Sequence, residues 1–181
     1  IPRLLTTPFS LRFYHALDHM RRTLDAGITT VRDAGGADLG VKQAQASGLV
    51  AGPRMQISIT ALSTTGGHGD GWMPSGNALE LFPAYPGAPV NICDGVEEVR
   101  RKVREVLRAG AEVIKVCATG GVLSPTDHPE FTQFSEAELR VMVEEGAYRR
   151  GVKVMAHAQG AEGIKNAVRA GLHSIEHGIY L

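Results

Sequence analysis

Apolar and polar positions along the chain follow a repeated pattern, in which an amphipathic stretch with helical spacing ends in glycine and passes directly into a β-branched, apolar run. The pattern occurs three times, at Gly27, Gly110 and Gly171, and each glycine is expected to be the C-cap of the preceding helix. Two further apolar runs also follow glycines. The five predicted strands cover residues 28–31, 54–59, 113–117, 153–158 and 174–177.

Two helix starts are marked by the spacing of a capping box, in Asp94 with Glu97 and in Ser135 with Glu138. Helices therefore alternate with strands, which predicts a parallel sheet with right-handed crossovers. Such a sheet is either open and doubly wound or part of an eight-stranded barrel of about 250 residues. No G-x-G-x-x-G motif follows a predicted strand, and polar residues gather at the C-terminal ends of the strands, where barrel enzymes have their active sites. The barrel is the favoured prediction.

Composition and charge narrow the expected partners to small molecules. The chain of 181 residues, 43% hydrophobic and 21% charged, is ordinary for a globular protein, and we predict one partial barrel domain over residues 1–181. With 19 basic and 19 acidic residues the net charge is zero, which leaves no electrostatic footprint for nucleic acid, and no apolar run approaches a membrane span. We therefore expect a small-molecule substrate, no nucleic acid and no membrane partner, and leave association into homo-oligomers open.

Other features bear on compartment, completeness and loops. Cys93 and Cys117 are too few for a disulfide framework, and reduced thiols fit a cytoplasmic protein. The first residue is Ile1, so we expect the chain to begin inside a longer protein. Residues 63–93 are rich in glycine and proline and are predicted to form a long loop or lid.

Lys115 lies inside an apolar strand-like run, where an unpaired ammonium is costly to bury. Because side chains alternate along a strand, Lys115 shares one face with Cys117, while Ile114 and Val116 share the face that packs against helices. Lys115 is thus expected to point into the barrel. The alternative is a structural lysine paired with a carboxylate.

Each of the next two predicted strands ends in a histidine, His157 and His177. Imidazole is the commonest protein ligand for zinc, and two histidines at matching positions are less easily explained by core packing than one. Carboxylation of Lys115 by carbon dioxide would turn a poor ligand into a carbamate whose two oxygens can bridge two metal ions. The three side chains together predict a metal site at the barrel mouth.

Several short segments resemble the amidohydrolase superfamily, in its prolidase-like and imidazolonepropionase-like branch. They are residues 27–36, 65–69, 114–116 with the Gly pair at 120–121, 156–158 and 174–178. The resemblance implies a TIM-type (β/α)8 barrel, of which this chain would hold about strands 2 to 6. It also implies two divalent ions, with zinc as the expected metal, bridged by carboxylated Lys115, and His157 and His177 on the second ion.

The same resemblance implies substrate contacts for residues after the third and sixth strands. His68 in the segment 65–69 resembles a histidine that contacts the scissile carbonyl or the tail of the substrate, and Gly66 and Gly67 would let the backbone approach closely. Tyr180 resembles a tyrosine that donates its hydroxyl to substrate. The alternatives are a loop histidine without a role and a tyrosine packed at the rim.

The chain also departs from the family pattern. The family's first-strand His-x-His pair is absent, since His15 and His19 are four residues apart in a helical stretch and are interpreted as helix residues, with a zinc-binding pair as the alternative. No later strand brings the family's catalytic aspartate. Arg32 and Asp33 are expected to form a structural ion pair, with a positioning pair for the loops or an anchor for a substrate carboxylate as the alternatives. Glu176 is expected to face the helices.

These features predict a binuclear metal-dependent amidohydrolase, similar to dipeptidases or carboxypeptidases, that cleaves amide-type C–N bonds with a metal-activated water. The expected substrates are Xaa-Pro or similar dipeptides and N-acyl amino acids. Carbamates, ureas or toxin amides on the same site are the first alternative. A non-catalytic α/β binding domain or an inert fragment is the second.

Overall fold

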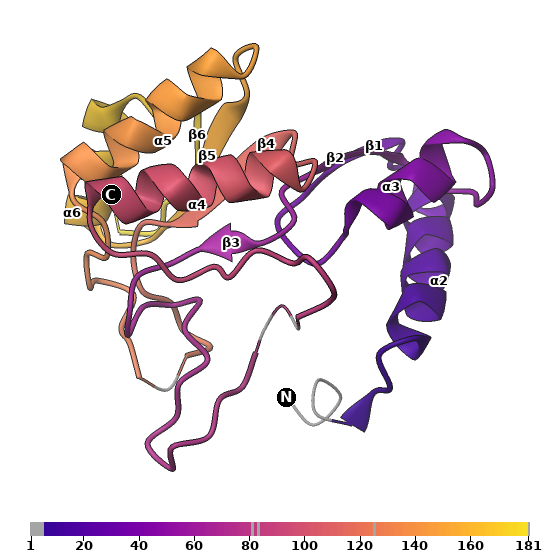
Figure 1. The fold of residues 1–181 in the computed structure, drawn as a ribbon, viewed down its shortest axis with the longest axis horizontal. Coiled ribbons are helices and arrows are strands. Elements are labelled where there is room, and N and C mark those ends of the chain that lie inside the picture. Colours follow the sequence, from indigo (N-terminus) through magenta and orange to yellow (C-terminus); the bar gives the residue numbers. More distant parts are fainter. Residues whose placement is uncertain (1–5, 81, 83, 125, 181) are drawn as a thin grey trace.

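The computed structural model describes residues 6–80, 82, 84–124 and 126–180. Helices and parallel strands alternate along the chain, which confirms the predicted α/β order (Figure 1). The elements are α2 (Leu11–Asp25), β1 (Thr30–Asp33), α3 (Leu39–Ala46), β2 (Arg54–Ile57), β3 (Ala61–Leu62), α4 (Val96–Arg108), β4 (Val113–Cys117), α5 (Glu136–Tyr148), β5 (Lys153–Ala158), α6 (Ala161–Ala170) and β6 (Ser174–His177).

The strands form two parallel sheets, which are connected by the bent segment between β2 and β3. β1 pairs with β2, and β3, β4, β5 and β6 pair in that order. The strand predicted at 54–59 ends at Ile57, because Ile59 has a positive φ of 69° and leaves the extended conformation. Two hydrogen bonds hold the bend, from Glu112 N to Ile57 O at 2.8 Å and from Gly36 N to Ile59 O at 3.1 Å. The short β3 that follows was not predicted.

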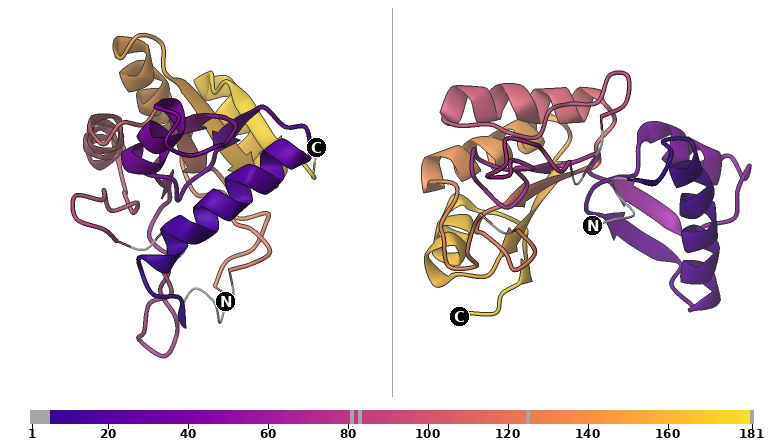
Figure 2. Two further views of the ribbon diagram at one scale, coloured as in Figure 1. Left: turned by 90° about the vertical axis from the view of Figure 1, so that its right-hand side faces the viewer. Right: turned by 90° about the horizontal axis from the view of Figure 1, so that it is seen from below.

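The core lies between the four-stranded sheet and the helices α4, α5 and α6, whereas α2 and α3 lie beside the β1–β2 pair (Figure 2). On β4, Ile114 and Val116 are fully buried in this core, which confirms the face predicted for them. Fully buried partners come from α4 (Val99, Val103, Val106), α5 (Leu139, Met142) and β5 (Val154, Ala156). Burial of such side chains stabilises the fold by roughly 1.5–3 kcal/mol each.

Both predicted helix starts lie within one residue of the observed ones, but only one has the predicted capping box. Ser135 and Glu138 form the complete capping box of α5. At α4 the N-cap is Gly95, because the carboxylate of Asp94 instead accepts hydrogen bonds from the backbone N and the hydroxyl of Thr65, at 3.1 and 2.6 Å. Asp94 therefore ties down the loop that follows β3.

The glycines that end helices have the left-handed backbone expected of them. Gly171 is the C-cap of α6, with φ 85°. Gly27 and Gly110 also have positive φ, at 82° and 103°, but come one residue after the C-caps, which are alanines. The glycine signal thus located each helix end to within one residue.

The segment 63–93 contains no helix or strand among its described residues, as expected of a long loop. Isolated bridges join Ser63 to Ile92 and Trp72 to Ala78. Both cysteines are free and buried. In the part of the chain that the structure describes, no helix is both long and apolar enough to cross a membrane.

Candidate functional site

Parallel pairing brings the predicted ligands to one end of the four-stranded sheet. Cys117 of β4 is in register with His157 of β5, which is in register with Glu176 of β6. Lys115 lies two residues before Cys117, on the same face. The strand alternation therefore places Lys115, His157 and Glu176 on the face opposite the helical core.

Lys115 is buried without a partner. The residue is only 7% exposed, and burial lowers the pKa of its amine, against smaller raising effects of Cys117 and Glu176. No hydrogen bond or ion pair joins its Nζ to any residue that the structure describes. No carboxylate among these residues pairs directly with Lys115, although the charge of Glu176 acts on it.

His157 is a neutral, oriented imidazole. It is 5% exposed, and its pKa is lowered to about 4, mainly by burial and further by His68, His177 and Lys115. Its Nε2 lies 2.8 Å from the carbonyl oxygen of Gly120. Because a carbonyl only accepts, Nε2 carries the proton and Nδ1 keeps a free lone pair.

A threonine hydroxyl supports this orientation. Thr119 Oγ1 donates to the Gly120 carbonyl at 2.9 Å and accepts from the backbone N of Gln159, also at 2.9 Å. Thr119 is fully buried. The Gly120 carbonyl that accepts from His157 Nε2 is thus itself held by Thr119, whose hydroxyl is fixed by the backbone of Gln159 just after β5.

His177 reaches the same place by a break in the strand alternation. A regular strand would put His177 on the face opposite Glu176, but its φ of 75° turns the chain. Its ring centroid lies 4.8 Å from that of His157, at an interplanar angle of 71°. Left-handed backbone in a non-glycine residue costs about 1–3 kcal/mol and is concentrated at functional sites.

The expectation that Glu176 faces the helices is wrong. Its carboxylate accepts from Ser174 Oγ at 2.7 Å and from the guanidinium of Arg32 at 3.3 Å, so it lies on the side of Lys115 and His157. Hydrogen bonds and the Arg32 charge lower the pKa of Glu176. The contact joins β6 to β1, and thus an edge strand of the four-stranded sheet to a strand of the two-stranded sheet.

Asp33 does not pair with Arg32. Its carboxylate accepts from the backbone N of Gly35 at 3.0 Å and of Ala37 at 3.2 Å. Burial raises the pKa of Asp33, and these two hydrogen bonds oppose the rise. Asp33 therefore positions the loop after β1, which was one of the alternative roles expected for this pair.

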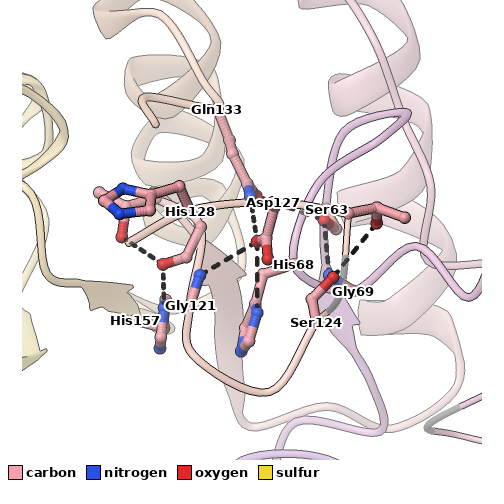
Figure 3. A network of polar contacts seen from close by, with 12 residues as sticks. Ser63, His68, Gly69, Gly121, Ser124, Asp127, His128, Gln133 and His157 are labelled. Carbon is pink, nitrogen blue, oxygen red and sulfur yellow. Dashed lines mark hydrogen bonds and ion pairs between the residues drawn. The ribbon is translucent and has the colours of Figure 1, made fainter. Parts of the chain in front are cut away.

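His68 packs directly on the predicted ligand His157. Their rings stack with centroids 4.5 Å apart and planes at 15°. Its Nδ1 lies 3.4 Å from Oδ2 of Asp127, a residue of the loop after β4 (Figure 3). Asp127 was not predicted from the sequence, since nothing in the spacing of its loop indicates that Asp127 contacts His68.

The other predicted substrate contacts remain predictions. Gly66 N donates to Asp70 Oδ2 at 2.7 Å and Gly67 N to Thr64 O at 2.9 Å, so both amides are engaged within their own turn. The side chain of Tyr180 is 47% exposed. Its backbone N donates to Gln159 O, which fixes the chain just after His177.

The donors fit a metal site once Lys115 is counted as a ligand. Among the described residues, no group of three or more His, Cys, Asp or Glu side chains is arranged to hold a metal ion. However, the rings of His157 and His177 are in contact, and the charge of Lys115, an unpartnered buried amine, acts on His157. His15 and His19 belong to α2, which lies away from the four-stranded sheet and these ligands (Figure 1). Their ring centroids are 6.4 Å from each other.

Comparison with known proteins assigns the family. Residues 5–181 match the Amidohydrolase family, and the chain belongs to this family. It is 47% identical over 165 residues to an ochratoxinase of Aspergillus niger, a match that covers 87% of this chain. The chain spans 34% of the length of that relative.

Solved structures agree in fold. A prolidase complexed with N-methylphosphonate-L-proline superposes with a TM-score of 0.86 at 46% identity, covering 98% of this chain and 44% of that one. The A. niger ochratoxinase gives 0.84 at 43% identity, covering 96% and 42%. A Xaa-Pro dipeptidase with bound methionine in the active site gives 0.81 at 34% identity, covering 96% and 44%. The predicted TIM-type amidohydrolase fold, with about strands 2 to 6 in this chain, is confirmed.

Proposed function

We propose that the protein is a metal-dependent hydrolase that cleaves amide-type C–N bonds of small substrates, such as Xaa-Pro dipeptides and N-acyl amino acids. The observation that carries the proposal is Lys115, a buried amine without a partner beside neutral His157. Membership of the Amidohydrolase family and the hydrolase names of the relatives support enzymatic character.

The ligands of this chain would be Lys115, His157 and His177. In the proposal the unprotonated form of the Lys115 amine attacks carbon dioxide: an N–C bond forms as one C=O π bond breaks, the released proton passes to solvent water, and the product is a carbamate anion. His157 would bind through Nδ1, because its Nε2 is engaged by Gly120. Two divalent ions, with zinc expected, would supply Lewis acidity that lowers the pKa of water and polarises the substrate carbonyl.

In the proposal, residues of this chain orient the ligand His157 and keep bulk water out of the site. The Gly120 carbonyl fixes the rotation of His157, and the stacked ring of His68 covers one face of that imidazole. His68 would meet the carbonyl or the tail of the substrate from this position. Burial of Lys115 and His157 keeps bulk water away from them and strengthens electrostatic interactions there.

The named relatives support a dipeptide substrate. One solved relative is a prolidase that holds a proline derivative, and another is a Xaa-Pro dipeptidase with methionine in its active site. A substrate with a free carboxylate next to the scissile bond is therefore the first to test. Tyr180 and the glycines of the 65–69 turn would contact it.

A toxin amide is the second candidate substrate. The identity of 47% to the A. niger ochratoxinase over 165 residues supports it. The same site residues would serve either substrate, since the distinction rests on loops that shape the pocket rather than on Lys115 or the histidines.

The test is a substrate panel on the intact, zinc-loaded protein, with Lys115→Met as the variant. We expect hydrolysis of at least one of a Xaa-Pro dipeptide, an N-acetyl amino acid and ochratoxin, and loss of activity by about a thousandfold or more in the variant. Lys102→Met is the matched control, because Lys102 is also 7% exposed but pairs with Glu105 at 2.9 Å. Equal activity of Lys115→Met and Lys102→Met would sink the proposal.

A further inference from the structure

We propose that Asp127 is a positioning residue that aims His68 at the substrate. This inference deepens the proposed function, since it concerns the same site. It rests on the contact between a buried carboxylate in the loop after β4 and a histidine in the loop after β3 (Figure 3).

The carboxylate of Asp127 is buried with few donors of its own. Its side chain is 1% exposed. Oδ2 accepts from Gly121 N at 3.0 Å and from Gln133 Nε2 at 3.4 Å, and lies 3.4 Å from His68 Nδ1. Oδ1 has no partner among the described residues. Burying a carboxylate with only neutral donors is costly, so a further N–H donor from His68 would stabilise the buried Asp127.

The contact determines which nitrogen of His68 faces outward. His68 Nδ1 is buried and has no hydrogen-bond partner among the described residues, and Asp127 Oδ2 is the acceptor that lies beside it. Because a carboxylate only accepts, in the proposal the proton lies on Nδ1 and Nε2 is left for a substrate. In Figure 3 the second nitrogen of His68 points away from Asp127, to the same side as the second nitrogen of His157. The separation of 3.4 Å is long for a hydrogen bond, and contacts of this kind often tighten when substrate binds.

The ring of His68 also contacts His157 and the backbone of Gly121. His157 stacks on it with centroids 4.5 Å apart. A Cβ on Gly121 would lie 2.2 Å from His68 Cε1, so the ring packs directly against the Gly121 backbone. Asp127 also accepts a hydrogen bond from the backbone N of this Gly121. It therefore contacts both the ring of His68 and the backbone segment that the ring packs against.

The same loop supplies a matched control. His128 Nδ1 lies 3.8 Å from Glu130 Oε2, and both side chains are exposed. Glu130→Gln therefore makes the same chemical change as Asp127→Asn, and His128→Gln the same change as His68→Gln, on a pair that touches no predicted site residue.

The experiment is a double-mutant cycle on the intact, zinc-loaded protein with a Xaa-Pro dipeptide, or with whichever probe of the panel the parent protein hydrolyses. We expect Asp127→Asn to lower kcat/KM by about 10–100-fold in the parent. In the His68→Gln background the same change should cost less than about threefold. Glu130→Gln should be neutral in both backgrounds. Equal losses from Asp127→Asn in the two backgrounds, or no loss in either, would overturn the inference.

A readout that needs no activity is the tautomer of His68, measured by nitrogen-15 NMR of the protein labelled at histidine and assigned with His68→Gln. A proton on Nδ1 in the parent, altered in Asp127→Asn and unchanged in Glu130→Gln, is the expected result. A proton on Nε2 alone in the parent contradicts the inference. If the tautomer is as expected while no panel substrate is hydrolysed, the proposed function fails and the positioning contact stands.

Discussion

The rings of His68 and His157 lie parallel, with centroids 4.5 Å apart and planes at 15°. One belongs to the loop after β3 and the other to β5, so the contact joins the predicted substrate side of the site to its predicted metal side. Any change that moves one ring is expected to affect the other.

Gly121→Ala tests this coupling through a steric change alone. The added methyl would meet the His68 ring at 2.2 Å, a distance too short to be kept, so the ring or the loop would have to move. We expect kcat/KM to fall at least about tenfold with the fold retained, measured by steady-state kinetics and circular dichroism. In Gly40→Ala the methyl meets only the flexible Asp38 carboxylate, at 3.3 Å, and activity should be kept. Full activity of Gly121→Ala would contradict the packing described.

The pH dependence of stability tests the environment of His157. Its pKa is lowered from the ordinary 6.5 to about 4, so between these values the unfolded chain binds a proton that the folded chain does not. Stability of the metal-free protein should therefore fall as pH is lowered from about 6.5 to about 4, with no further loss from this group below.

Urea denaturation of the parent and of His157→Gln across this range measures the effect. The difference in free energy of unfolding between the two proteins isolates His157 from other titrating groups. We expect the difference to change with pH between about 6.5 and about 4 and to be flat above. A constant difference over the whole range would show that burial does not perturb this imidazole.

Glu145 tests the packing that supports the sheet. Its buried carboxylate accepts from Arg100 Nη1 at 2.7 Å and from Arg104 at 2.9 Å, which joins α5 to α4, and these partners lower its pKa. Glu145→Gln should lower the free energy of unfolding by about 2 kcal/mol in urea denaturation. Glu136→Gln, which removes an exposed pair with Arg140, should change it by less than about 0.5 kcal/mol. Similar effects of the two changes would remove the structural role assigned to Glu145.

Much of the architecture could be predicted because it depends on local periodicity. Alternation along β4 gave the correct faces of Lys115 and Ile114, and glycines located helix ends to within one residue. The bend at Ile59 could not be predicted, since a β-branched residue with φ 69° goes against its own local preference and is held there by tertiary contacts.

The candidate site shows the same division. His157 and His177 were predicted from their positions at strand ends, but the face of Glu176 was assigned wrongly because regular alternation was assumed up to His177, whose φ of 75° breaks it. Asp127 was not predicted, because its partner His68 lies on another loop and no periodic pattern relates the two.

The metal content of the intact protein, measured by inductively coupled plasma mass spectrometry on the parent and on Lys115→Met, tests the central claim most directly. We predict about two divalent ions per chain in the parent, with zinc preferred, and less than half of that in the variant. A parent protein that hydrolyses its amide substrate while holding no metal, or a variant that binds as much metal as the parent, would contradict the account.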